Sequence, residues 1–269
     1  MRELNHLSEI FEAYDTFVID LWGVIHNGIK LNEKAIETVD KLKKNSKKII
    51  FLSNAPRPSA KVIDYLIKMK MDKKYLTNVI TSGEAAMHAI NKNKFGKTFF
   101  HIGPNKDSSI FDKVQENKTK DIVNCDFILG TGLFDNQKKD LNFYKNFLKK
   151  YTFKKFVCTN PDLTVHKGNS EEYCAGSVAK TFEEIGGKVI YFGKPYEEIY
   201  NLCFNKKEKV LAIGDNLRTD IKGANNMKKD CLFISTGVHR DEFETNTELH
   251  NLLKKYVVKA NYFQKELQW

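Results

Sequence analysis

Cysteine, proline and long apolar runs are scarce in this chain of 269 residues. Its five cysteines are scattered and odd in number, and no two have the Cys-x-x-Cys spacing, so neither a disulfide framework nor a zinc site is indicated. No segment approaches the roughly 18 consecutive apolar residues of a membrane helix, and the first six residues lack the apolar core of a signal peptide. We therefore expect a cytoplasmic protein that does not associate with membranes.

The sequence also lacks the patterns that mark nucleic-acid-binding proteins. Its formal net charge is +10, but the lysines are spread along the chain, without a basic tail or an alternation of aromatic and basic residues. We interpret these lysines as solvated surface residues and expect no nucleic-acid partner. Hydrophobic residues make up 41% of the chain, which suffices for a sizeable core in one large domain or two ordinary ones.

Short β-branched apolar runs alternate with amphipathic helical patterns along the chain. The expected strands are residues 16–22, 48–53, 78–82, 99–102, 126–129, 156–159, 189–192, 210–213 and 231–234. The expected helices include residues 33–44, 60–69, 84–91 and 171–185. Repeated strand-then-helix units predict the α/β class with a doubly wound parallel sheet, and the middle strands could form an inserted domain.

Chemically reactive side chains follow several of these strands. Asp20, Ser53, Lys194 and Asp215 each stand at or just after the carboxyl end of an expected strand, and Asp220 comes five residues after Asp215. In an open α/β sheet, ligands bind at the carboxyl ends of the strands, so these groups are expected to converge. Clustered carboxylates repel one another unless a cation lies among them, and hard oxygen ligands around a phosphoryl group suit Mg²⁺.

The order of four segments strengthens this interpretation. They are Asp20-Leu21-Trp22-Gly23-Val24, Leu52-Ser53-Asn54-Ala55, Gly193-Lys194-Pro195 and Gly214 to Ile221. In this order they resemble the four motifs of the haloacid dehalogenase superfamily, specifically its phosphatase branch with the large cap (subclass IIA). Over nearly the whole chain, the resemblance implies a Rossmann-like core at residues 1–96 and 189–269, with an α/β cap inserted at residues 97–188.

The resemblance also implies roles for these residues. Asp20 corresponds to the nucleophile that becomes phosphorylated, and Lys194 to the lysine that binds the phosphoryl group and stabilises its charge. Ser53 and Asn54 lie where the family binds phosphoryl oxygens. The implied cofactor is Mg²⁺, held by Asp20, Asp215 and the backbone carbonyl of residue 22, with Asp220 supporting the ligands from behind.

A further segment, Cys158-Thr159-Asn160-Pro161-Asp162, resembles the Thr-Asn-Pro-Asp segment of the cap in this branch. Asn160, Asp162 and His166 are therefore candidates for substrate contacts, although such residues are also common turn formers. His26, six residues after Asp20, is another candidate. Its alternative role is that of a loop histidine that faces solvent or caps the next helix.

One position departs from the family pattern. The family's phosphatases carry a second aspartate two residues after the nucleophile, which protonates the leaving group and later activates water, whereas this chain has Trp22. The favoured interpretation is an Mg²⁺-dependent phosphatase of phosphorylated small molecules, such as sugar phosphates or nucleotides. Either the substrate then has a good leaving group, or another residue supplies the proton, with His26, His166 and Asp162 as candidates.

Two alternatives remain open at this stage. The first, suggested by the missing acid, is a catalytically weakened protein that binds a phosphate ligand or has a regulatory role. Attack by Asp20 on carbon, as in the dehalogenases, is the weaker alternative, because those relatives need no metal and usually carry a different cap. A homodimer is one option for the assembly.

Overall fold

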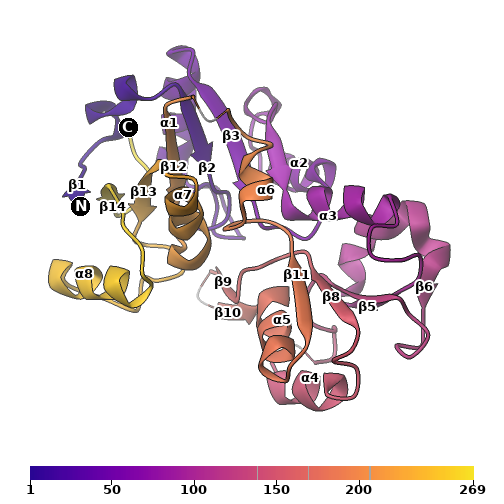
Figure 1. Ribbon diagram of the computed structural model, residues 1–269. Coiled ribbons are helices and arrows are strands. Elements are labelled where there is room, and N and C mark those ends of the chain that lie inside the picture. Colours follow the sequence, from indigo (N-terminus) through magenta and orange to yellow (C-terminus); the bar gives the residue numbers. More distant parts are fainter. Residues whose placement is uncertain (138, 169, 206) are drawn as a thin grey trace.

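The computed structural model describes residues 1–137, 139–168, 170–205 and 207–269, and their strands form three sheets. The largest has seven strands in the order β1-β14-β13-β12-β2-β3-β4, and all of its neighbouring strands are parallel. Its strands are β1 (Arg2–Glu3), β2 (Thr16–Ile19), β3 (Lys48–Ser53), β4 (Val79–Thr81), β12 (Val210–Gly214), β13 (Asp230–Ile234) and β14 (Tyr262–Gln264). The N- and C-terminal ends of the chain lie near each other beside this sheet (Figure 1).

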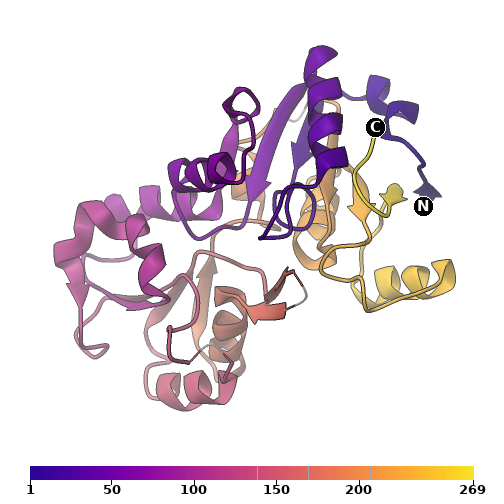
Figure 2. The ribbon, with the colours of Figure 1, turned by 180° about the vertical axis from the view of Figure 1, so that it is seen from behind.

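Helices cover both faces of the large sheet because its central strands are apolar on both sides. In β2, Phe17 and Ile19 pack into the cluster that includes Val39 of α1 and Leu66 of α2, whereas Val18 packs with Ile199 of α6 on the other face. Seen from behind, α1 lies across the face of the sheet that carries Phe17 and Ile19 (Figure 2). The helices of this part are α1 (Glu33–Lys44), α2 (Ser59–Lys68), α3 (Ser82–Asn91), α6 (Glu197–Tyr200), α7 (Lys222–Asn226) and α8 (Asn246–Lys255).

The second sheet has five parallel strands in the order β11-β8-β7-β5-β6. These strands are β5 (Phe99–Ile102), β6 (Lys118–Thr119), β7 (Phe127–Gly130), β8 (Lys155–Cys158) and β11 (Lys188–Tyr191). Helices α4 (Leu141–Leu148) and α5 (Ala175–Glu184) pack on it through a common apolar cluster. The short helical turns of the chain are η1 (Leu7–Glu9), η2 (Phe11–Ala13), η3 (Lys73–Tyr75), η4 (Asn105–Asn117) and η5 (Leu217–Ile221).

The third sheet is an antiparallel hairpin of β9 (Thr164–Lys167) and β10 (Ser170–Tyr173), which lies between the other two sheets (Figure 1). Two expectations need correction here. The helix expected from residue 171 begins at Ala175, because the preceding residues pair with β9. Strand β11 pairs with β8, so residues 188–191 belong to the five-stranded sheet, whereas the expected boundary placed residue 189 in the core.

The predicted α/β class, with a doubly wound parallel sheet and an inserted α/β unit, is confirmed. Strands β2 and β12 are neighbours, and the chain proceeds from them in opposite directions, toward β4 and toward β14. The topological switch point therefore lies between β2 and β12, where open α/β sheets bind ligands. Within the described residues, we find no helix that combines the length and the apolarity needed to cross a membrane.

Candidate active site

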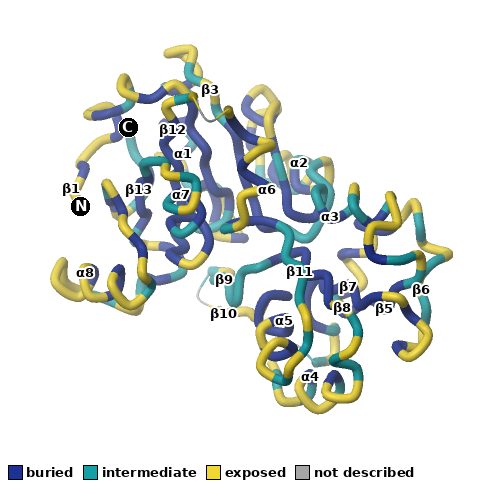
Figure 3. The backbone as a smooth tube through the Cα atoms, viewed as in Figure 1, coloured by how far each residue is buried: buried dark blue, intermediate teal, exposed yellow. Residues whose placement is uncertain are grey.

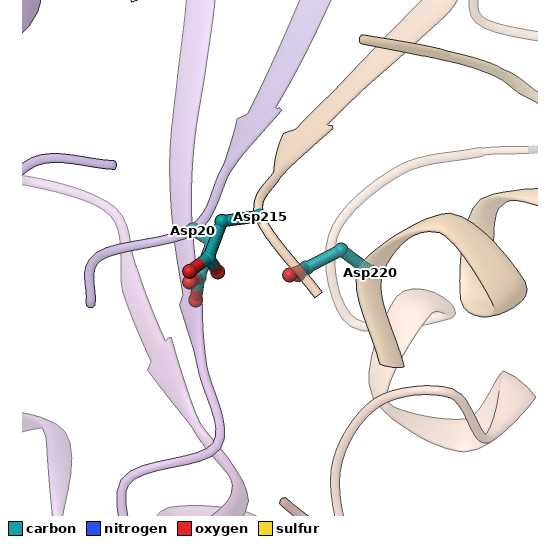
Figure 4. Close-up of side chains that lie close together, drawn as sticks. All are labelled: Asp20, Asp215 and Asp220. Atoms are coloured by element: carbon teal, nitrogen blue, oxygen red, sulfur yellow. The ribbon is translucent and has the colours of Figure 1, made fainter. Parts of the chain in front are cut away.

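Three carboxylates meet at the switch point. Asp20 follows β2, Asp215 follows β12, and Asp220 lies in the turn η5, which begins two residues after Asp215. The backbone N–H of Asp20 donates to Ile213 O at 2.8 Å, which holds the two strand ends together. One oxygen from each carboxylate lies within 4.8 Å of the others, and all three residues are buried. Figure 4 shows Asp20 and Asp215 side by side, with Asp220 pointing toward them.

Lys194 supplies positive charge to this cluster. Its Nζ donates to Asp20 Oδ1 at 2.5 Å, to Asp220 Oδ1 at 2.7 Å and to the carbonyl oxygen of Leu52 at 2.9 Å. Burial disfavours the ammonium form, but Asp20 and Asp220 raise the pKa of Lys194 well above its usual value, so it stays charged. Burial raises the pKa of Asp20 to about 8 against the opposing effect of Lys194.

Space and donor chemistry around Asp215 fit a small hard cation. A Cβ at Gly23 or at Gly237 would collide with the Asp215 carboxylate, so glycine at both positions keeps this side chain in place. One of its oxygens accepts the backbone N–H of Val238 at 2.7 Å. Burial, together with the neighbouring Asp20 and Asp220 carboxylates, raises the pKa of Asp215 well above its usual value. The donor set of buried carboxylate oxygens suits Mg²⁺.

Ser53 and Asn54 lie at the end of β3, beside Lys194. The side chain of Asn54 pairs with the backbone of Lys194, accepting its N–H at 2.8 Å and donating to its carbonyl at 3.2 Å. Ser53 accepts the backbone N–H of Ala55 through its hydroxyl oxygen, and its O–H can still donate. Asn54 therefore aligns the Gly193-Lys194 segment, while Ser53 keeps a donor for a ligand.

The cap contributes Asp162 to the same place. Its Oδ1 accepts hydrogen bonds at 3.2 Å from the side-chain amides of Asn54 and Asn216, which follow β3 and β12. Asn160 stabilises the loop by accepting the backbone N–H of Asp162 at 3.1 Å. Burial raises the pKa of Asp162. The structure thus brings Asp162 to the core end of the site, whereas Asn160 contacts its own loop.

His26 is buried, with 4% of its surface exposed, so the alternative of a solvent-facing loop histidine is wrong. Its Nδ1 accepts the backbone N–H of Gly28 at 3.0 Å, and burial lowers its pKa to about 4. The neutral ring packs edge-on against Trp22, with ring centroids 5.0 Å apart. Trp22 in turn donates its indole N–H to the carbonyl oxygen of His166 in β9 at 2.8 Å.

A cleft of about 1340 Å³ lies between the core and the cap, and every site residue expected from the sequence lines it. Sequence reasoning missed the cations that also line this cleft. They are Lys30, Lys34, Arg57, Lys106, Lys139, Lys167 and Arg240. Isolated basic residues in a lysine-rich chain carry no spacing signal, so only the fold could single them out.

The parallel sheet, its inserted cap and the buried carboxylate and lysine cluster define an α/β protein with a Rossmann-like core and a polar site at its switch point. Residues 17–116 match the family described as haloacid dehalogenase-like hydrolase, and residues 191–259 match a second family described as HAD-hydrolase-like. The chain belongs to the haloacid dehalogenase-like hydrolase superfamily, and it is a phosphohydrolase.

Individual relatives agree with this assignment. The chain is 26% identical to the 5'-nucleotidase YutF of Bacillus subtilis over 242 residues, covering 87% of this chain and 92% of that protein. It is 24% identical to the 4-nitrophenylphosphatase of Schizosaccharomyces pombe over 269 residues, covering 87% and 88% of the two chains. A haloacid dehalogenase-like hydrolase from Brucella suis superposes with a TM-score of 0.85 at 26% identity, covering 99% of this chain and 100% of that one.

Proposed function

We propose that this protein is an Mg²⁺-dependent phosphatase of phosphorylated small molecules that uses Asp20 as its nucleophile. The observation that carries the proposal is the buried contact of Lys194 with Asp20 and Asp220, beside Asp215, at the topological switch point. Relatives named 5'-nucleotidase, acid sugar phosphatase and 4-nitrophenylphosphatase support a phosphate monoester as the substrate.

The chain's own residues suffice to describe the first step. The Asp20 carboxylate forms a bond to phosphorus while the ester P–O bond breaks, and the leaving oxygen departs with the bonding electrons. In this proposal the Lys194 ammonium neutralises the phosphoryl oxygens and the Ser53 hydroxyl holds them; the contact of Lys194 with Asp20 and the free O–H of Ser53 support these roles. Mg²⁺, held by Asp20, Asp215 and the carbonyl oxygen of Trp22, would supply positive charge to those oxygens. Water then attacks phosphorus, releases phosphate and regenerates Asp20.

Proton transfer is the step that position 22 does not support. The indole N–H of Trp22 is a hydrogen-bond donor to His166 O and does not ionise at working pH. An alkoxide leaving group is strongly basic and depends on a proton, whereas a phenolate leaves readily as an anion. We therefore infer a preference for phosphate esters with good leaving groups.

A panel of phosphorylated metabolites and 4-nitrophenyl phosphate, assayed with Mg²⁺ and with a chelator, tests the proposal. We expect phosphate release that depends on Mg²⁺ and is lost in Asp20→Asn, which keeps the shape of the side chain but removes the nucleophile. Release that persists in Asp20→Asn would refute the nucleophile assignment. Tight phosphate binding with no release from any substrate would instead favour a phosphate-binding protein that has lost its chemistry.

A further inference from the structure

The β9–β10 hairpin is a two-stranded ribbon that forms one wall of the cleft. Its residues Thr164 to Gly168 and Glu171 to Tyr173 line the cavity, while all four residues of β10 are exposed (Figure 3). An isolated hairpin is marginally stable in water, because it buries little apolar surface. The position of this wall therefore depends on whatever fastens the hairpin to its neighbours.

Two core loops fasten it. From the loop after β2, the indole N–H of Trp22 donates to His166 O at 2.8 Å, and the carbonyl oxygen of Asn27 accepts the N–H of Gly168 at 3.1 Å. From the loop after β13, the Arg240 guanidinium donates to His166 Nδ1 at 3.1 Å and to Gly168 O at 3.4 and 3.5 Å. Bonds from both loops thus meet at the same short segment, His166 to Gly168, at the end of β9.

The indole is itself held in one orientation. Its ring packs edge-on against His26, and Gly28 lies so close to it that a Cβ there would collide with the indole. The carbonyl oxygen of Gly28 accepts the Tyr65 hydroxyl of α2 at 2.8 Å, and the Tyr65 ring packs against His26. The N–H of Trp22 thus points at the hairpin from a rigid, packed support in the core.

We propose that Trp22 is a positioning residue that fastens the β9–β10 hairpin to the nucleophile loop and so sets the substrate-facing wall of the cleft. Trp22 lies two residues after Asp20, where the family's phosphatases carry a proton donor. In this chain the residue at that position makes a hydrogen bond that connects the nucleophile loop to the hairpin. Its effect on substrates rests on the proposed phosphatase function, whereas the connection itself is a property of the folded chain. Large substrates that reach the hairpin depend on it more than small ones bound at the core.

Hydrogen exchange measured by mass spectrometry on Trp22→Phe tests the connection directly. Phenylalanine keeps an aromatic ring against His26 but cannot donate to His166 O. We expect amide exchange in residues 164–168 and 170–173 to accelerate about 2- to 10-fold, the factor for one hydrogen bond of ordinary net strength. The matched control is Trp269→Phe, because Trp269 packs on Phe11 at 4.7 Å, outside the cleft lining, and should leave the hairpin unchanged.

Unchanged hairpin exchange in Trp22→Phe, relative to the control, would overturn the proposal. If Trp22→Phe does not fold, amide exchange in the unaltered protein tests the proposal instead. We then expect the hairpin amides to exchange at least about tenfold more slowly than those of an unstructured chain, and exchange at the rate of an unstructured chain would overturn the proposal.

Kinetics separate positioning from general destabilisation. For a nucleoside 5'-monophosphate as the longer substrate, Trp22→Phe should raise KM about 2- to 10-fold with a smaller change in kcat. For 4-nitrophenyl phosphate, KM should change less than for the longer substrate. Equal changes in KM for both substrates would overturn the inference that Trp22 affects large substrates more than small ones. Hydrogen exchange can be measured without turnover. If the protein is inactive but the hairpin amides exchange faster in Trp22→Phe, the proposed function is refuted and the positioning role of Trp22 is still supported.

Discussion

Replacement of Lys194 by methionine should expose how strongly the carboxylate cluster depends on one ammonium group. The side chains of Lys194, Asp20 and Asp220 are 4%, 9% and 6% exposed, and Lys194 Nζ lies 2.5 and 2.7 Å from the two carboxylates. Removal of one partner from such a buried pair costs about 3–5 kcal/mol, because the remaining charge is left uncompensated. For a domain of about 150–250 residues, that corresponds to a fall in Tm of about 6–20 °C.

The cost should depend on pH. Burial already raises the pKa of Asp20 to about 8, and the loss of Lys194 removes a group that lowers it, so the pKa rises further in Lys194→Met. A carboxyl with a raised pKa in the folded state binds more protons there than in the unfolded chain, and stability falls as pH rises between the unfolded pKa of about 4 and the folded value. The destabilisation should therefore be larger at pH 8.5 than at pH 5.5.

Thermal unfolding in a chelating buffer at these two pH values provides the measurement. The matched control is Lys44→Met, since Lys44 also contacts a carboxylate, that of Asp40 at 2.6 Å, but is 71% exposed on α1. We expect no measurable loss of stability in the control, because solvent screens an exposed pair. If Lys194→Met unfolded at the same temperature as the control at pH 8.5, the carboxylates would not depend on Lys194, and the reasoning would fail.

Three further predictions follow from the site and the cap. Mg²⁺ at a hundred times its Kd should stabilise the protein by about 2.7 kcal/mol, and Asp215→Asn should abolish this gain in thermal unfolding; an unchanged gain would exclude Asp215 as a ligand. If the cap moves about connections near Gly96 and Gly187-Lys188, these segments should exchange amide hydrogens faster than the central strands, and equal protection would contradict such movement. An activated aryl phosphate should give a burst of about one equivalent, and Trp22→Asp should raise turnover of alkyl phosphates more than of aryl phosphates, by up to about 10²–10⁴-fold. Equal gains for both classes in a folded variant would show that another residue already supplies the proton.

The sequence alone determined the class of fold and the position of the chemistry. Strand ends can be located from apolar runs, and helix 33–44 was predicted with the observed bounds of α1. Asp20 and Asp215 could be expected to meet, because parallel strands of an open sheet present their carboxyl ends on one side. Alternating strands and helices predict the parallel sheet. The adjacency of β2 and β12, which brings these two residues together, is a property of the folded chain.

Only the tertiary structure decided how the polar loops are used. The hairpin at residues 164–173 was missed because its strands are short and mostly polar, and residues 171–173 resemble the start of the helix that follows. Nothing in a lysine-rich sequence marked Arg240 as a residue of the site. From the sequence, Trp22 could be recognised only as the replacement of an acidic residue of the family pattern. Their partnership with His166 depends on loops that are far apart in the chain and meet only when the cap packs on the core. Side-chain chemistry is local, but a hydrogen bond between distant loops needs the whole fold to bring donor and acceptor together.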